Sequence, residues 1–251
     1  MNLDTRWLAP DTRRVFELLR PRFELHEFTL IGGSALALQI GHRLSQDLDF
    51  YFPGDALPNR SIRTVLAGAR EAGFTTQDML SPAQIQNTRI NHATDLRQWV
   101  QDWAIGGIKV SFSIFEGFNE PMQAVNAFPK VPDPGTTFAV LGIEGLFAAK
   151  AALLARRVRS RGLFDIKVLL DQHGYSIRQL FAAVKRIDPS ANSDVHRDVL
   201  RGLLPLDADD EGFAAINVTD TVDDLYAYFR PLVDAYEREE AKRIIDEVRR
   251  R

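Results

Sequence analysis

The chain of 251 residues has no cysteine. Disulfides and thiolate metal sites are therefore excluded, and nothing in the sequence requires an oxidising compartment. The chain also lacks any apolar run near the ~20 residues that a membrane-spanning helix needs. Its first residues lack the basic-then-apolar order of a signal peptide. We therefore expect a cytoplasmic protein that does not enter a membrane.

Histidine is also scarce, and positively charged residues do not outnumber negatively charged ones. The five histidines are scattered without the regular spacing of a helical metal site. The net charge is −3 and the sequence pI is about 6.0. Because a dedicated nucleic-acid binder is usually basic overall, this balance argues against one as a default, while leaving room for a local basic site. The densest basic segment, 156–161, holds four arginines in six positions.

Proline and glycine concentrate at one place, between residues 129 and 135, and this is the one strong linker signal. Before it, apolar periodicity predicts a lobe of helices and strands, and after it the pattern is helical. We expect an α+β fold with an α/β lobe at 1–135 and a helical lobe at 136–251. The expected N-terminal elements are helices at 11–20, 34–40 and 61–72, strands at 27–31 and 47–52, and a strand-rich stretch at 74–115 with a hairpin turn at Gly106-Gly107. The expected C-terminal helices span about 142–159, 162–173, 176–187, 192–204 and 221–249.

Two carboxylates alternate with apolar side chains in the segment 47–52. Strand geometry places Asp47 and Asp49 on one face, opposite an aromatic-rich face. Two neighbouring carboxylates repel each other, and Mg²⁺, which proteins commonly hold with one or two carboxylates and substrate phosphates, would compensate them. Alone, the pattern fits an acidic edge strand equally well. The aromatic opposite face favours a core strand whose acidic face has a function.

An apolar strand upstream of this segment runs into Gly32-Gly33-Ser34 at the start of a helix. Glycines let a phosphate approach the backbone, and a serine there can cap the helix or bind a phosphate oxygen. A Gly-Gly-Ser turn is common by itself. Followed by one short helix and then Asp-x-Asp on the next strand, it is far more specific.

The segments 31–38, 41–43 and 45–50 together resemble the nucleotidyltransferase superfamily of the DNA polymerase β type. Within that superfamily they look most like the AbiEii/AbiGii toxin family, the enzymatic half of bacterial abortive-infection toxin–antitoxin pairs. The resemblance spans residues 25–173. It implies a polymerase β-like lobe with a mixed sheet, followed by a helical lobe.

The resemblance also implies functional roles. Gly33 and Ser34 would hold the triphosphate of a nucleoside triphosphate, and Asp47 and Asp49 would be catalytic ligands of Mg²⁺. The activity would be transfer of a nucleotide to RNA such as tRNA, and a cognate antitoxin protein would be the partner.

A second part of the resemblance lies in the helical lobe. Lys150 is the one charged residue between 145 and 155, and a lone ammonium on an apolar helix must reach the surface or meet an anion. With Arg161 and Asp165 after it, it resembles the second half of the AbiEii signature, although Gly162 stands where many relatives have an acid. The resemblance implies that Lys150 contacts the triphosphate and that Asp165 is a catalytic or metal-adjacent acid. Arg157 and Arg161 could meet phosphates, or belong to an exposed, solvated helix end.

One position departs from the pattern that the resemblance implies. Members of the superfamily often carry a third acid on a neighbouring strand, which in this chain should be 108–115, and Ser111 stands at the expected place. Serine is a poor metal ligand and a poor base, so Glu116 or Asp165 would have to substitute.

The acidic stretch 207–211 lacks the spacing of a calcium loop and predicts a solvated loop.

Three functions therefore remain open from the sequence. The first is an Mg²⁺-dependent nucleotidyltransferase toxin acting on RNA. The second is a nucleotidyltransferase acting on a protein or a small-molecule hydroxyl, which the mildly acidic pI favours. The third is a nucleotide-binding module with weak catalysis, which the missing acid at Ser111 favours.

Overall fold

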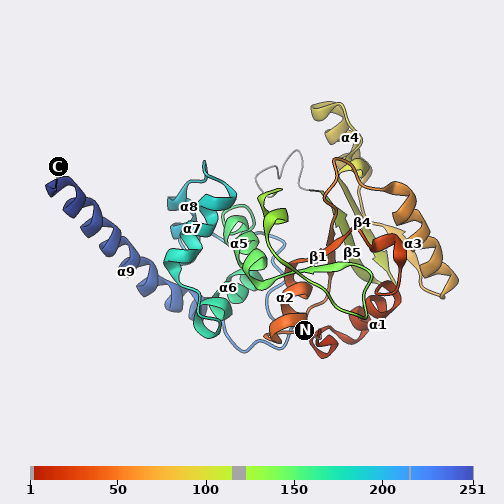
Figure 1. The fold of residues 1–251 in the computed structure, drawn as a ribbon, viewed down its shortest axis with the longest axis horizontal. Coiled ribbons are helices and arrows are strands. Elements are labelled where there is room, and N and C mark those ends of the chain that lie inside the picture. Colours follow the sequence, from red (N-terminus) through yellow and green to blue (C-terminus); the bar gives the residue numbers. More distant parts are fainter. Residues whose placement is uncertain (1–2, 115–122, 215, 251) are drawn as a thin grey trace. The chain divides into compact units, whose positions relative to one another are not determined.

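The computed structural model describes residues 3–114, 123–214 and 216–250 (Figure 1). The chain forms two compact units, Met1–Leu146 and Phe147–Arg251. The first unit contains the sheet and the second is built from helices. An α/β part followed by a helical part is the order expected from the sequence.

A mixed sheet of seven strands forms the frame of the N-terminal unit. The strand order is β3-β4-β5-β2-β1-β7-β6. The pairs β1–β7 and β2–β5 are parallel and the other pairs are antiparallel, so the expected α+β class with a mixed sheet is confirmed. The strands are β1 Thr29–Ile31, β2 Leu48–Tyr51, β3 Thr76–Asp78, β4 Val100–Ile105, β5 Ile108–Ser113, β6 Lys130–Val131 and β7 Ala139–Leu141.

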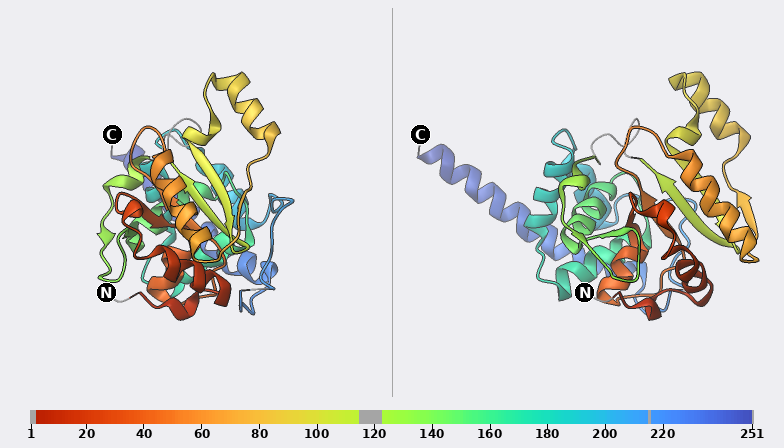
Figure 2. Two further views of the ribbon diagram at one scale, coloured as in Figure 1. Left: turned by 90° about the vertical axis from the view of Figure 1, so that its right-hand side faces the viewer. Right: turned by 45° about the vertical axis from the view of Figure 1, so that its right-hand side comes forward.

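The helices of this unit lie between the strands in the chain. They are α1 Pro10–Leu19, α2 Gly32–Ile40, α3 Asn59–Glu71 and α4 Pro82–His92, with short 3-10 turns at Thr5–Trp7, Phe23–Leu25 and Leu96–Gln98. Helices α1 and α3 cover one face of the sheet (Figure 2). Ring contacts run from Phe16 of α1 through Phe138 to Phe50 of β2, with centroids 5.9 and 5.0 Å apart, so this covered face is the aromatic one.

Helix α4 was not expected, because the stretch 74–115 was predicted to be strand-rich. Its start has clear local causes: Pro82 lies in the first turn, and Ser81 and Gln84 form a reciprocal capping box. Thr88 is its one buried residue, so α4 has almost no apolar stripe for periodicity to detect. In Figures 1 and 2 it stands away from the strands.

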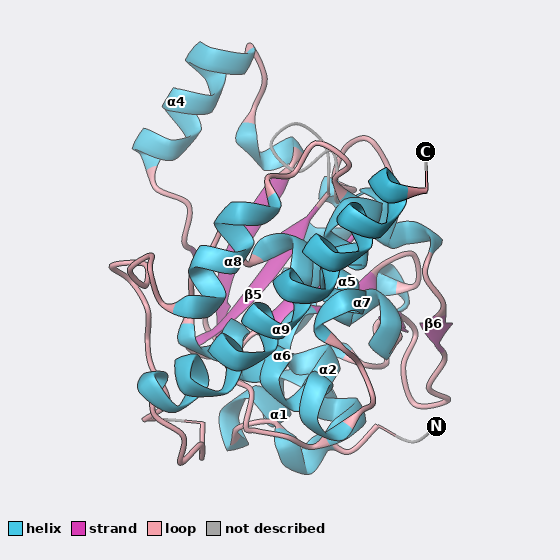
Figure 3. Ribbon diagram, turned by 90° about the vertical axis from the view of Figure 1, so that its left-hand side faces the viewer, coloured by secondary structure: helices cyan, strands magenta, loops and turns pink. Residues whose placement is uncertain are grey.

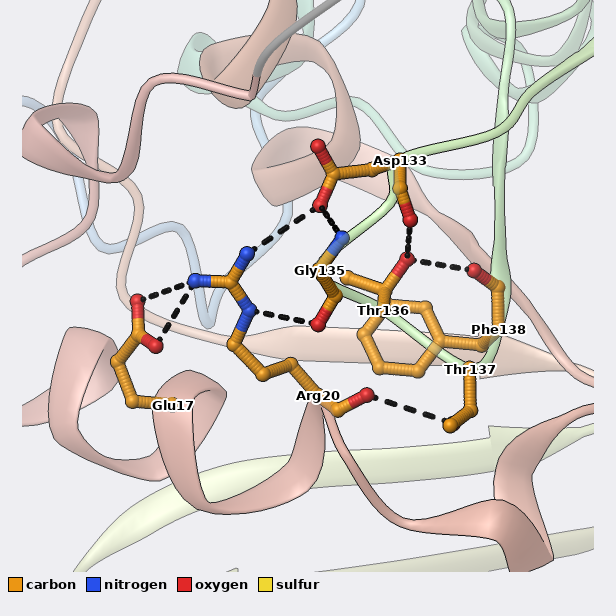
Figure 4. A network of polar contacts seen from close by, with 7 residues as sticks. All are labelled: Glu17, Arg20, Asp133, Gly135, Thr136, Thr137 and Phe138. Atoms are coloured by element: carbon orange, nitrogen blue, oxygen red, sulfur yellow. Dashed lines mark hydrogen bonds and ion pairs between the residues drawn. The ribbon is translucent and has the colours of Figure 1, made fainter.

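The segment expected to be a linker is instead fixed to the end of α1 (Figure 4). Arg20 donates from Nε to the carbonyl of Gly135 at 2.9 Å and forms an ion pair with the buried carboxylate of Asp133 at 3.3 Å. Thr137 donates its hydroxyl proton to the carbonyl of Arg22 at 2.6 Å. The chain then enters β7, which pairs with β1. The N-terminal unit therefore continues to Leu146, beyond the boundary expected near residue 135.

The C-terminal unit is helical, as the sequence predicts (Figure 3). The helix expected at 142–159 is shorter than predicted, because α5 ends at Leu153. Residues 154–159 connect it to α6, so the arginine-rich segment 156–161 lies partly in this connection and partly in the first turn of α6. Helices α7 and α9 begin with capping boxes at Ser176 and Thr221. In the described parts of the chain, no helix is long and apolar enough to cross a membrane. The helices are α5 Ile143–Leu153, which starts in the first unit, α6 Ser160–Gln172, α7 Ile177–Ile187, α8 Ser193–Arg201 and α9 Val222–Arg249.

Candidate active site

The turn between β1 and α2 lies against the carboxylate of Asp49. Antiparallel pairing places Asp49 opposite Ile31, the last residue of β1. Gly32 follows with a φ of +75°, in the left-handed region that glycine tolerates. A Cβ at Gly32 would lie 2.5 Å from Oδ2 of Asp49, which is too close. A side chain at position 32 would thus push this carboxylate away, and glycine lets the carboxylate lie directly against the turn.

Asp47 immediately precedes β2 and is tied to the same turn. The buried hydroxyl of Ser34 donates to the backbone carbonyl of Asp47 and lies 2.9 Å from the hydroxyl of Ser45. These contacts fix the start of α2 to the segment that leads into β2. The side chain of Ser34 therefore positions Asp47, while the role in triphosphate binding implied by the resemblance stays a prediction.

Arg43 is a functional candidate that the sequence analysis did not assign. Its side chain is 5% exposed, and its Nη1 donates to the carbonyl of Leu44 at 3.0 Å. A Cβ at Gly33 would lie 2.5 Å from Nη2 of Arg43, so the guanidinium packs against the first turn of α2. A helix N-terminus attracts anions through its backbone N–H groups, and a guanidinium beside it strengthens that attraction. The turn thus has the chemistry of a phosphate site around Gly33.

The strand expected to carry a third acid is β5, and it does lie next to β2. The two strands are parallel, and Asp49 is the register partner of Ser111. The expectation that Ser111 occupies the position beside the acidic pair is therefore confirmed. Glu116, one of the two expected substitutes, lies outside the described residues.

The donor set of the turn fits a divalent cation that also binds its substrate. Asp47 and Asp49 bring two carboxylates to this turn, and Gly32 allows that of Asp49 to approach the start of α2 closely. Among the residues that the structure describes, no group of three or more Asp, Glu, His or Cys side chains could hold a metal. Two carboxylates suffice for Mg²⁺, which keeps waters and substrate phosphates as its other ligands.

In the C-terminal unit, Lys150 meets an anion inside its own lobe. Its Nζ lies 2.5 Å from Oδ2 of Asp165 on α6. The two side chains are 14% and 1% exposed, and a carboxylate buried this deeply needs such a partner. The structure therefore brings together the two residues that the resemblance singles out in this lobe. Their catalytic roles stay predictions.

The acidic stretch 207–211 is a largely exposed loop, as predicted, and its carboxylates also form ion pairs with the arginine-rich segment 156–161. Arg161 forms an ion pair with Glu211 at 2.6 Å and donates to the carbonyl of Gly212. Arg159 bonds Asp209, and this hydrogen bond, with a smaller contribution from the exposed Arg157, holds the pKa of Asp209 below its usual value. Arg161 is thus committed to an internal partner, and Arg157 is the more accessible of the two predicted phosphate contacts.

Comparison with known proteins adds the family of the chain. A model of the nucleotidyl transferase AbiEii toxin of type IV toxin–antitoxin systems matches residues 15–239. The chain belongs to the AbiEii family. As the motifs of the glycine turn and the acidic strand predict, this AbiEii protein is a nucleotidyltransferase toxin of the type IV class.

Individual relatives of the AbiEii protein are distant. The uncharacterized protein aq_aa25 of Aquifex aeolicus (strain VF5) is 26% identical over 182 residues, which cover 72% of this chain and 76% of that protein. The crystal structure of JHP933 from Helicobacter pylori aligns over 96% of this chain and 99% of that chain, with 14% identity and a TM-score of 0.49. MenT4, the nucleotidyltransferase toxin Rv2826c of Mycobacterium tuberculosis H37Rv, aligns over 84% and 86%, with 15% identity and a TM-score of 0.35.

Proposed function

We propose that this AbiEii protein transfers a nucleoside monophosphate from a nucleoside triphosphate to a hydroxyl of an RNA acceptor such as tRNA, and that the transfer depends on Mg²⁺ at Asp47 and Asp49. The observation that carries the proposal is the close approach of the Asp49 carboxylate to Gly32, which places this carboxylate at the N-terminus of α2. A carboxylate pair and a helix N-terminus together suit a metal-bound triphosphate.

The protein groups have distinct tasks in this proposal. Backbone N–H groups at Gly33 and Ser34, with the guanidinium of Arg43 beside them, bind and orient the triphosphate. Asp47 and Asp49 hold the metal, which when bound neutralises charge that develops on the phosphates. Ser34 keeps Asp47 in place through the bond to its carbonyl.

The helical unit contributes the Lys150–Asp165 pair and Arg157. The family resemblance assigns Lys150 to the triphosphate and Asp165 to catalysis, and the buried ion pair shows that the two side chains are held in a fixed geometry. Arg157, exposed at the turn before α6, is available for a phosphate of the nucleotide or the acceptor. An antitoxin protein is the partner that the family implies.

A protein or small-molecule hydroxyl is the second candidate acceptor. The observation that favours it is the net charge of −3, which gives the whole chain no general attraction to RNA. The outcome of the assay with RNA decides between the acceptors.

The test is transfer from each of four α-labelled nucleoside triphosphates, with Mg²⁺ and total bacterial RNA, by wild type, Asp49→Asn and Asp78→Asn. Asp78 lies in the same sheet but not beside the glycine turn, so its variant is the matched control. We expect label in a tRNA-sized band with wild type and Asp78→Asn, and at least about 100-fold less with Asp49→Asn. Titration with Mn²⁺ should show a matching loss of metal affinity in Asp49→Asn.

Two results would contradict parts of this proposal. Label in protein or small-molecule fractions, with none in RNA, would move the acceptor to the second candidate. Unchanged Mn²⁺ affinity in Asp49→Asn would remove the metal from this carboxylate.

A further inference from the structure

A row of polar side chains crosses three adjacent strands at the level of Asp49. Asp49 on β2 is the register partner of Ser111 on β5, and Ser111 is the register partner of Asp102 on β4. Register partners in a sheet point to the same face. Asp102 therefore lies on the face that carries Asp49, with one serine between them.

The spacing of this row leaves room for a reacting group. Neighbouring strands lie about 4.8 Å apart, so the backbones at Asp49 and Asp102 are about 10 Å apart. Ser111, the residue between the two carboxylates, has a short and partly exposed side chain. A phosphoryl group bound on the Asp49 side and a hydroxyl approaching from the Asp102 side fit this interval.

Asp102 is held in place but remains accessible. Its Oδ2 lies 3.3 Å from Nζ of Lys109, the neighbouring polar residue on β5, and the Asp102 side chain is 25% exposed. The register places Asp102 two strands away from Asp49, on the same face of the sheet. This position suits a carboxylate that takes a proton without binding the metal.

We propose that Asp102 is the catalytic residue that takes the proton from the attacking hydroxyl of the acceptor, the task for which an acid at position 111 was expected. This inference rests on the proposed nucleotidyl transfer at Asp47 and Asp49. The acceptor oxygen forms a bond to the α-phosphorus, and the bond from that phosphorus to the pyrophosphate oxygen breaks. Pyrophosphate leaves with the bonding electron pair, and the hydroxyl proton passes to a carboxylate oxygen of Asp102.

The competing interpretation is that Asp102 serves only as the ion-pair partner of Lys109. Variants of the two residues separate these roles. Lys109→Met removes the ion pair and keeps the carboxylate, whereas Asp102→Asn keeps the shape and removes the base. Asp78→Asn is the matched control, because Asp78 on β3 is the register partner of Trp103, which points to the opposite face, and is similarly ion-paired, to Arg97 at 2.6 Å.

The experiment measures kcat, KM for the nucleoside triphosphate and Mn²⁺ affinity for the full-length variants, with thermal unfolding as a check of folding. We expect Asp102→Asn to lower kcat by at least about 100-fold, because a general base contributes on the order of 10²–10⁴ to the rate. KM and Mn²⁺ affinity should stay within about threefold of wild type, since Asp102 touches neither triphosphate nor metal. Lys109→Met and Asp78→Asn should keep kcat within about threefold of wild type.

A rescue experiment tests the position of the acid directly. Adding Ser111→Asp to Asp102→Asn returns a carboxylate to the same row, one strand nearer to Asp49. We expect the double variant to regain at least about tenfold of the lost kcat. If Asp102→Asn does not fold, Asp102→Ser, alone and combined with Ser111→Asp, gives the same comparison.

Several outcomes would overturn the inference. A kcat of Asp102→Asn close to wild type removes the role of base, and an equal loss in Lys109→Met assigns the effect to the ion pair. A loss of Mn²⁺ affinity in Asp102→Asn makes the residue a metal ligand instead. Absence of transfer by the wild type overturns the proposed function, and this inference with it, whereas failure of Asp102 alone leaves the function intact.

Discussion

At the scale of single residues, a glycine lies where a carboxylate approaches the backbone closely. Gly32 combines a positive φ with a close approach of the Asp49 carboxylate, so both its backbone and its missing side chain are required. Gly162 in α6 is different, because a Cβ there would meet no atom within 4 Å. The two glycines make a matched pair for substitution.

Gly32→Ala should lower Mn²⁺ affinity by at least about tenfold, because the new methyl group displaces Asp49, and should cost about 1–2 kcal/mol for the left-handed backbone. Gly162→Ala should raise the free energy of unfolding by about 0.5–1 kcal/mol and leave metal binding unchanged. Calorimetric Mn²⁺ titration and denaturant unfolding measure both effects. Wild-type metal affinity in Gly32→Ala would show that the position of Asp49 against Gly32 does not matter for metal binding.

The sequence predicts some of these residues better than others. Asp47 and Asp49 follow from alternation on a strand, which is a local pattern. Arg43 lies in the segment 41–43 that carries the family resemblance, but its role was not assigned, because its burial against Gly33 depends on how the loop after α2 returns to the sheet. A buried arginine near a glycine turn has no sequence signal of its own.

At the scale of elements, the turn of the hairpin β4–β5 fixes which residues of the two strands pair. The turn at Gly106-Gly107 was expected, and a two-residue turn pairs Ile105 with Ile108. Counting outward from that pair aligns Asp102 with Ser111. The acid on β4 was therefore within reach of the sequence once the turn was known.

The start of α6 is an element that depends on a distant residue. Arg159 supplies no side-chain cap, and the carboxylate of Asp210 instead accepts from the backbone N–H and the hydroxyl of Ser160, both at 3.0 Å. Such a cap contributes about 1 kcal/mol. Because the partner lies fifty residues later in the chain, the sequence of α6 alone does not reveal it.

Asp210→Ala should therefore lower the free energy of unfolding by about 1–2 kcal/mol, through the lost cap and an exposed helix N-terminus. Asp209→Ala, which removes a more exposed carboxylate from the same stretch, should leave the free energy of unfolding nearly unchanged. Urea unfolding followed by circular dichroism measures both variants. Equal losses would mean that charge, and not the cap on α6, explains the contribution of this stretch.

At the scale of the whole molecule, ion pairs between distant segments set the boundaries that composition alone misplaced. The segment around Gly135 has the proline and glycine content of a linker, but Arg20 binds it to α1 and keeps β7 in the first unit. Proline and glycine content predicts how a segment behaves when nothing binds it, whereas this segment is bound by Arg20. The acidic stretch 207–211 likewise has partners, since its carboxylates form ion pairs with Arg159, just before α6, and with Arg161, in its first turn.

Low pH should weaken the hydrogen bonds and ion pairs of several carboxyl groups in the C-terminal unit. Hydrogen bonds, several of them from arginines, hold the pKa of a set of carboxyl groups below their usual values. A carboxyl group with a lowered folded-state pKa adds stability above its unfolded pKa, and that stability is lost as the pH falls through the folded value. The affected groups in the C-terminal unit are Asp188, Asp209, Asp224, Glu237 and Glu240.

Arg201 offers the sharpest test of this pH dependence. It contacts Glu237 at 2.5 Å and Asp234 at 2.6 Å, and its hydrogen bond is the main cause of the lowered pKa of Glu237. Arg201→Met should cost about 1 kcal/mol at neutral pH, and nearly nothing at a pH below the lowered folded-state pKa of Glu237, where this carboxyl group is protonated and wild type loses the same contact. Arg14→Met is the control, because Arg14 and its partner are both highly exposed and should contribute little at either pH. Denaturant titrations at the two pH values measure the difference, and an equal cost at both would show that Arg201 stabilises α8 and α9 by packing instead of by charge.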